Sequence, residues 1–232
     1  MTEPERKRGR THDAEGARQA ILNAAEEVFA EHGFDGARVD AIAAAAGYNK
    51  SLIFQYFEDK LGLYAAMIRR ADDQTRSIQS EVIAALIDDE TLLDPGKLRA
   101  LLKTYLSAYF DFLVEHPRFM KVFLWEMAEG WKTYSKILTQ RDYDDVQDFQ
   151  PLLQKLQDAG LLRPGFNPTA QVILIEFLIP SYLALVPLYQ AILPSKDFSS
   201  SEALAPAREY IVEFAIRGLL NEVPQKTPQA GK

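Results

Sequence analysis

The chain lacks cysteine altogether and has only three histidines in 232 residues. Without cysteine there is neither a disulfide nor thiolate chemistry. The histidines, His12, His32 and His116, are too scattered to favour a histidine-built metal site. The sequence also lacks a recognisable nucleophile–base spacing, phosphate-binding loop or metal-ligand cluster. It therefore predicts no catalytic residues, no metal and no cofactor, and it favours a binding protein over an enzyme.

The N-terminus has no apolar segment of the kind that signal peptides carry, so the expected location is the cytoplasm. One apolar stretch, residues 172–193, has the length needed to cross a bilayer. However, Glu176 is charged, Pro180 and Pro187 interrupt the stretch, and no Lys/Arg cluster lies close to its ends. We therefore expect no membrane span but a buried helix, covered by a second subunit.

The net charge of −7 argues against a nucleic-acid partner at first sight. The distribution of charge softens this objection, because residues 6–10, RKRGR, carry four positive charges. A local basic surface can bind phosphate even on an acidic protein. Two readings of this N-terminal segment stay open: a disordered arm that reaches into a minor groove, or an unstructured end that improves solubility.

Strand-like alternation is absent, and helical periodicity dominates the chain. A first helix is predicted over residues 13–32, with an apolar residue at every third or fourth position and Gly33 as its stop. Two short helices are predicted over residues 39–46 and 50–57, and Asn49 is well suited to cap the second. A longer helix is expected to begin near Asp59.

Two short helices joined by a glycine turn form the pattern of a helix-turn-helix. The helix over residues 50–57 is too short to be stable alone, so Ile53 and Phe57 are expected to pack it against its neighbours, with Leu63 and Phe29 as partners. Its opposite face then presents lysine, amide and aromatic side chains. Such a face suits the major groove of DNA, where amides and lysine bond base edges and apolar groups meet thymine methyls.

The segment GFDGARVDAIAAAAGYNKSLIFQYFEDKLGLYAAM resembles the TetR family of bacterial transcriptional regulators. The resemblance is carried by the Ile-Ala pair in the second helix, the Ala-Gly before the turn, the aromatic-x-aromatic-Phe end of the third helix, and the lysine and leucine that follow. In this sequence these are Ile42-Ala43, Ala46-Gly47, Phe54, Tyr56, Phe57, Lys60 and Leu63. The rest of the chain is similar to the family only in its helical layout.

The resemblance implies an all-α protein with an N-terminal three-helix helix-turn-helix domain, residues 13–62, and a helical effector-binding and dimerisation domain, residues 63–222. Residues 1–12 are expected to be a disordered basic arm and residues 223–232 a flexible tail. A homodimer would form through helices 168–193 and 202–220, bind a palindromic operator in double-stranded DNA, and leave it when a small-molecule effector binds. Repression is the expected outcome. A regulator that activates, or that responds to a protein partner or to nothing, and an enzyme remain the alternatives.

The resemblance also implies which residues contact DNA. Tyr56 and Lys60 would contact phosphate and thereby fix the register. Phe54 stands where the family usually has tyrosine, so it either meets a thymine methyl or is simply packed. Arg38 stands where a capping serine or threonine is common, and it either binds a phosphate or is a solvated surface residue. The expected DNA-contacting residues are Arg38, Tyr48, Asn49, Lys50, Ser51, Leu52, Phe54, Gln55, Tyr56 and Lys60.

Aromatic residues cluster in the middle of the chain and suggest an effector site. The expected contacts are Tyr105, Tyr109, Phe112, Phe123, Trp125, Glu126 and Phe177. A buried Glu126 among aromatics would suit a cationic or hydroxylated ligand; alternatively the aromatics form the core and Glu126 faces water. Glu176 is either another polar contact of the effector or the partner of Arg208 or Arg217 at the dimer interface.

Overall fold

The computed structural model describes residues 3–86, 93–139 and 144–221, with the side chains of residues 14–73, 93–139 and 150–221. Across these residues the chain is helical, and its only β-type pairing is an isolated antiparallel bridge between Leu162 and Leu220. The predicted all-α fold is therefore confirmed. The predicted tail, residues 223–232, lies outside the described residues.

The chain forms two compact units, and each contains two separate stretches of sequence. The first unit consists of Met1–Gln74 and His116–Asp142, and the second of Thr75–Glu115 and Tyr143–Lys232. This packing differs from the predicted boundary between residues 62 and 63, because the chain returns to the first unit after its excursion into the second. The predicted division of roles between an N-terminal and a C-terminal domain stays a prediction.

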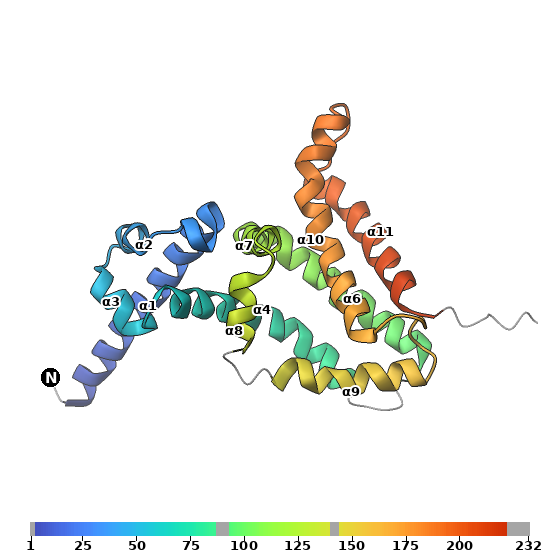
Figure 1. Ribbon diagram of the computed structural model, residues 1–232, viewed down its shortest axis with the longest axis horizontal. Coiled ribbons are helices and arrows are strands. Elements are labelled where there is room, and N and C mark those ends of the chain that lie inside the picture. The colour runs from blue at the N-terminus through green and yellow to red at the C-terminus, as the bar shows by residue number, and fades with distance from the viewer. Residues whose placement is uncertain (1–2, 87–92, 140–143, 222–232) are drawn as a thin grey trace, which may run out of the picture. The chain divides into compact units, whose positions relative to one another are not determined.

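Helices α1 to α3, the first part of α4, and helices α7 and α8 make up the first unit (Figure 1). Their bounds are Glu3–Gly36 for α1, Val39–Ala46 for α2, Lys50–Phe57 for α3, Lys60–Leu86 for α4, Pro117–Ala128 for α7 and Lys132–Thr139 for α8. Helix α2 packs on α1 and α3, while α7 packs on α1 and α8. All six contribute to one apolar core, whose buried members include Ile21, Phe29, Ile42, Ile53, Phe57, Leu63, Val122 and Ile137.

Helix α1 begins ten residues earlier than the sequence predicted, at Glu3 rather than at position 13. Residues 3–12 thus belong to α1 in this structure, and their role as a basic arm stays a prediction. Pro4 stands in the first helical turn, where its missing N–H leaves no bond unmade, and the Glu, Lys and Arg residues that follow have high helix propensity. The predicted stop is visible as a break within α1, where Gly33 has φ 68° and ψ 178°, a region that only glycine adopts readily.

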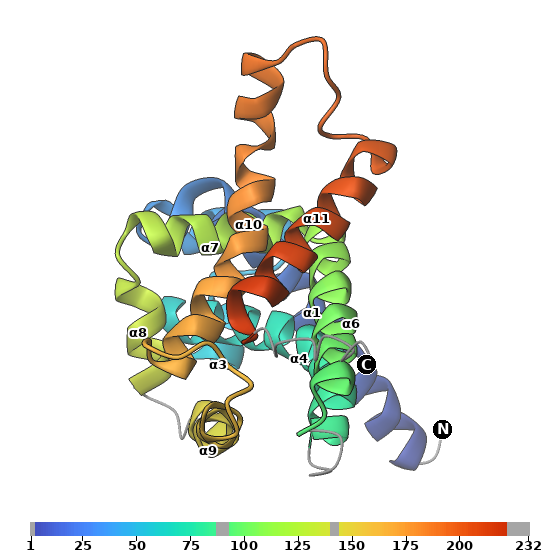
Figure 2. The ribbon, with the colours of Figure 1, turned by 90° about the vertical axis from the view of Figure 1, so that its right-hand side faces the viewer.

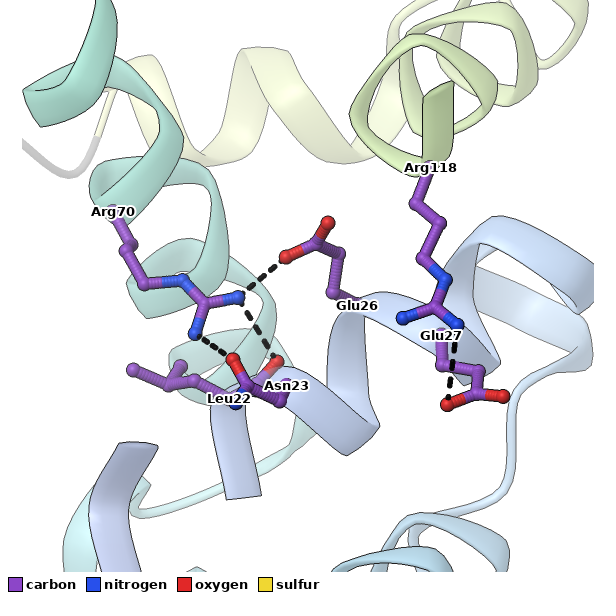
Figure 3. A network of polar contacts seen from close by, with 6 residues as sticks. All are labelled: Leu22, Asn23, Glu26, Glu27, Arg70 and Arg118. Carbon is purple, nitrogen blue, oxygen red and sulfur yellow. Dashed lines mark hydrogen bonds and ion pairs between the residues drawn. The ribbon is translucent and has the colours of Figure 1, made fainter. Parts of the chain in front are cut away.

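Arg70 fixes helix α4 on helix α1 (Figure 3). One guanidinium nitrogen donates to Asn23 Oδ1 at 2.6 Å, and the other lies 2.5 Å from Glu26 Oε2. On helix α7, Arg118 makes a single and longer contact with α1, 3.7 Å to Glu27. Since both arginines reach α1, they hold the first part of α4 and helix α7 to it.

The second unit contains the remainder of α4 with helices α6, α9, α10 and α11. Their bounds are Pro95–Glu115 for α6, Asp144–Asp158 for α9, Pro168–Ile192 for α10 and Ser201–Leu219 for α11. Helices α10 and α11 lie side by side, α6 packs on both, and α9 packs on α10 (Figures 1 and 2). Asn167 and Ser200 cap α10 and α11 by accepting hydrogen bonds from Ala170 N–H and Ala203 N–H.

Helix α10 is the one helix of the described residues that is long and apolar enough to cross a membrane. Only 11% of its most apolar 18-residue window is buried within the chain. Its exposed large apolar residues, with those of α11, are Ile173, Leu174, Leu185, Leu188, Ile192, Tyr210 and Phe214. The single chain therefore does not bury this helix, and any cover must come from outside it.

Candidate nucleic-acid interface

A tight turn sets helix α3 at an angle to helix α2. Gly47 has φ 74° and ψ 22°, and its N–H faces the carbonyl oxygens of Ala43 and Ala44. Glycine accepts this left-handed conformation without steric cost. Asn49 Oδ1 then accepts a 2.8 Å hydrogen bond from Leu52 N–H, which confirms the predicted cap of α3.

The inner face of α3 holds this short helix in place. Ile53 is fully buried and Phe57 is 5% exposed, in the same core as Phe29 and Leu63, as the sequence predicted. Leu52 and Tyr56 also pack against this core with part of their surface. Leu52, one of the expected DNA-contacting residues, therefore has only part of its side chain available to a partner.

The outer face of α3 presents Lys50, Ser51, Phe54 and Gln55 to solvent. Phe54 is 38% exposed, so it is not a core residue, and of the two readings only a surface role is left for it. Tyr48, in the preceding turn, is equally exposed at 38%. The structure thus brings the predicted reading residues onto one open face.

Lys50, the first residue of α3, has two neighbours on this surface. Its Nζ atom lies 3.1 Å from Asp40 Oδ1 in α2, and 5.8 Å from the centroid of the Phe54 ring. Asp40 was not among the predicted site residues. No periodic pattern links it to Lys50, because the two residues face each other only across the turn that Gly47 forms.

Two of the residues predicted to contact phosphate, Lys60 and Arg38, differ in burial and in their partners. Lys60 is half-buried: its Nζ donates to the Asp35 carbonyl oxygen at 3.3 Å and lies 4.6 Å from the Phe34 ring centroid. Burial lowers the pKa of Lys60, and the Asp35 and Glu129 carboxylates oppose this effect. Arg38 is exposed at the N-cap position of α2, where its side chain makes no capping hydrogen bond.

The residues expected to bind an effector are divided between the two units of the structure. Phe123, Trp125 and Glu126 belong to α7 in the first unit. The other predicted contacts, Tyr105, Tyr109 and Phe112 on α6 and Phe177 on α10, belong to the second unit. The sequence could not show this division, because α6 and α7 follow one another directly in the chain and yet pack in different units.

The α7 residues have structural partners in the first unit. Glu126 is only 2% exposed, so of the two alternatives the buried carboxylate is confirmed and the solvent-facing one is wrong. It accepts hydrogen bonds from the Tyr64 hydroxyl at 2.8 Å and from Tyr134 N–H at 3.0 Å. Burial and this carboxylate raise the pKa of Tyr64. Trp125 Nε1 donates to the Ala30 carbonyl oxygen at 3.3 Å. Glu126 and Trp125 thus have structural partners within the first unit, and an effector role for the α7 residues stays a prediction.

Within the second unit, Glu176 of α10 accepts a 3.0 Å hydrogen bond from the Tyr105 hydroxyl of α6. The Tyr105 ring is stacked on Tyr109, with centroids 6.2 Å apart. Burial raises the pKa of Glu176, and the Tyr105 hydrogen bond opposes this rise. Within the chain the arginines considered as its partners bond other carboxylates: Arg208 with Asp111 and Arg217 with Glu213.

A short exposed helix that is seated on two others across a glycine turn is the helix-turn-helix arrangement of DNA-binding proteins. Residues 21–67 match the family described as bacterial regulatory proteins, tetR family, and residues 99–214 match the tetracyclin repressor-like C-terminal domain. The chain therefore belongs to the TetR family of bacterial transcriptional regulators.

Individual relatives agree with this assignment. The chain is 26% identical over 212 residues to the HTH-type transcriptional repressor NicS of Pseudomonas putida. The aligned region covers 90% of this chain and 95% of NicS. It is 33% identical over 110 residues to the transcriptional activator FasR of Mycolicibacterium smegmatis, 47% of this chain and 46% of FasR.

Solved structures share the fold across most of the chain. A transcriptional regulator of Streptomyces coelicolor, SCO4942, has a TM-score of 0.57 at 26% identity and covers 88% of this chain and 98% of its own. The complex of SmeT with triclosan has a TM-score of 0.56 at 20% identity, covering 92% and 99% of the two chains. At that identity the second comparison shows the fold alone.

Proposed function

We propose that this protein is a ligand-responsive transcriptional regulator that binds a palindromic operator as a homodimer and leaves it when a small molecule binds. Family membership establishes regulation of transcription. The observation that carries the DNA-binding part is the outer face of α3, where Lys50, Phe54 and Gln55 are exposed while Ile53 and Phe57 anchor the helix. A rigid, exposed helix of this composition suits the major groove.

The exposed residues of this surface divide by chemistry into two roles. Lys50, Ser51 and Gln55 would bond base edges, and Phe54 would contact a thymine methyl group. Residues at the margin would bond phosphates and so fix the register without reading sequence. This second group consists of Arg38, Tyr48, Asn49, Tyr56 and Lys60, with the half-buried Leu52 supplying apolar contact between the two groups.

Repression is the outcome we propose for this regulator. NicS, which the chain matches along almost its whole length, is named a repressor. The activator FasR shares less than half of its length with this chain. A regulator that acts on chromosomal DNA would work in the cytoplasm, which is where we place this protein.

The proposed dimer uses the open faces of α10 and α11. Leu174 is 67% exposed, and Tyr210 and Phe214 are 72% and 58% exposed. Apolar patches of this kind on a soluble chain mark interaction sites, and a twofold dimer would cover the same patch on both copies. Leu174→Glu should then shift the molar mass measured by light scattering from two chains toward one. Leu93→Glu, at another exposed apolar position of the second unit, should leave the mass unchanged.

The proposed effector site lies in the second unit, between α6 and α10. Its candidates are Tyr105, Tyr109, Phe112 and Phe177, with Glu176 as the polar contact that bonds Tyr105. Aromatic walls with few polar groups are typical of small-molecule sites. A ligand that prefers a different spacing of the two α3 helices would shift the population away from DNA.

The DNA-binding proposal is tested with the full-length protein and a pool of random-sequence duplexes. We expect selection of a palindrome whose half-sites are about one helical turn apart. Tyr56→Phe and Lys60→Ala should weaken binding to every duplex, whereas Lys50→Ala should change the preferred sequence. Lys97→Ala, which removes an exposed lysine from α6, serves as the control. Failure of the wild type to select any sequence at low salt would refute the proposal.

A further inference from the structure

Asp40, in the first turn of α2, lies beside the residue with which α3 begins. Its two carboxylate oxygens are 3.1 Å and 3.2 Å from the Lys50 ammonium nitrogen. The same nitrogen lies over the Phe54 ring, 5.8 Å from its centroid. A lysine side chain is otherwise a mobile point charge on a flexible stem. Here a carboxylate and an aromatic face restrict where that charge can go.

The ion pair lies on the surface that faces DNA under the proposed function. Its side chains remain 46% exposed for Lys50 and 62% exposed for Asp40. A carboxylate at such a place repels phosphates and lowers general affinity for nucleic acid. The Asp40 carboxylate therefore opposes binding to DNA of arbitrary sequence, although the Lys50 ammonium group on the same surface could contact a phosphate.

We propose that Asp40 is a specificity-determining residue that acts by positioning Lys50. It keeps the ammonium group from neutralising whichever phosphate is near, and directs it toward a base acceptor such as guanine O6 or N7. Phosphate contacts carry no sequence information, so their suppression raises the ratio of specific to non-specific affinity. This inference rests on the proposed function, because it requires α3 to bind DNA.

The test uses Asp40→Asn in the full-length protein, since asparagine keeps the shape of the side chain and removes its charge. Two duplexes are compared: the one that the wild type selects from the random pool, and a scrambled duplex of the same composition. We expect affinity for the scrambled duplex to rise about tenfold at low salt, because two lysines per dimer become available for phosphates. Affinity for the selected duplex should change less, so the specificity ratio falls.

The salt dependence separates this mechanism from a purely structural role. Each added phosphate contact steepens the slope of log affinity against log salt by about 0.9. With one added contact per chain, the slope of the Asp40→Asn dimer on the scrambled duplex should be steeper by up to about 1.8. Both the higher affinity for the scrambled duplex and its steeper slope must disappear when Asp40→Asn is combined with Lys50→Met. Asp158→Asn removes the same charge from an exposed position at the end of α9 and should leave both affinities and both slopes unchanged.

Several outcomes would overturn the inference while the wild type still binds its selected duplex. Asp40→Asn could change both duplexes equally, match Asp158→Asn, or keep its effect in the Lys50→Met background. A loss confined to the selected duplex at an unchanged salt slope would show that Asp40 itself contacts a base, for instance a cytosine amino group. Failure of the wild type to select any duplex would instead refute the proposed function.

Discussion

The Glu126 carboxylate of α7 accepts a 2.8 Å hydrogen bond from the Tyr64 hydroxyl of α4, and both groups are buried. The second carboxylate oxygen accepts from Tyr134 N–H in α8. Tyr64 also meets Phe29 and Phe34 edge-on, with ring centroids 4.8 Å and 5.1 Å away. A single buried carboxylate thus ties α7 and α8 to the core that supports the helix-turn-helix.

Tyr64→Phe is expected to destabilise the first unit by about 1–3 kcal/mol, because it leaves a buried carboxylate oxygen without its donor. Both tryptophans of the chain, Trp125 and Trp131, belong to this unit, so urea unfolding followed by tryptophan fluorescence reports on it selectively. Tyr48→Phe, which removes a hydroxyl from an exposed ring, is the matched control and should change little. Equal midpoints for the two variants would mean that the Tyr64 hydroxyl contributes nothing.

Arg70→Met should cost more stability than Arg118→Met, although both remove an arginine that reaches α1 (Figure 3). Arg70 is only 20% exposed and donates to Asn23 Oδ1, Glu26 Oε2 and the Leu22 carbonyl oxygen, so its loss leaves three acceptors without a charged donor, at about 1–3 kcal/mol. Arg118 makes one exposed 3.7 Å contact, and such pairs contribute about 0–1 kcal/mol. The two unfolding curves, recorded by tryptophan fluorescence, should differ in midpoint. The reverse order would contradict the assignment of Arg70 as the main link between α4 and α1.

Gly33→Ala should be more damaging than Gly47→Ala, although both glycines have positive φ. A Cβ atom at Gly47 would meet nothing within 4 Å, so only the left-handed conformation opposes it, at about 1–2 kcal/mol. A Cβ atom at Gly33 would lie 3.0 Å from Trp125 Cδ2, and its φ and ψ fall where alanine is more strained still. We expect a loss of about 2–4 kcal/mol for Gly33→Ala. Similar melting temperatures for the two variants would show that α7 shifts without cost.

The elements that carry local signals were predictable from the sequence. Helices α2 and α3 have the predicted bounds because Gly47 and Asn49, which end one helix and cap the next, act on their immediate neighbours. The core role of Ile53 and Phe57 follows from their spacing of four. Helix stops, caps and apolar spacing depend only on residues a few positions apart, so the sequence predicts them directly.

Pairings between distant residues were not predictable in the same way. Tyr64 and Glu126 are 62 positions apart. The apolar periodicity of either helix does not indicate which other helix it packs against. The same limit explains why α7 was expected beside the effector rather than in the core of the first unit. Asp40 was missed for a related reason, because its contact with Lys50 depends on the angle that the turn imposes on two helices.

The pH dependence of stability should reveal the state of Glu176 in the second unit. Its pKa is raised above the ordinary value of 4.5, because burial disfavours the charged form. A raised pKa in the folded protein means that the stabilising contribution is complete below the unfolded value and is lost as pH rises through the folded one. The free energy of unfolding should therefore fall from pH 4.5 upward by more in the wild type than in Glu176→Gln.

Two further variants make this measurement decisive, with circular dichroism as the probe and protein concentration held constant. Tyr105→Phe removes the hydrogen bond that favours the ionised carboxylate, so it should raise the pKa further and extend the decline to higher pH. Glu209→Gln is the control of opposite sign: Lys103 lowers the pKa of Glu209, whose contribution to stability is therefore lost as pH falls. Superimposable pH profiles for the wild type and Glu176→Gln would show that Glu176 is solvated and charged, and would remove it from the proposed effector site.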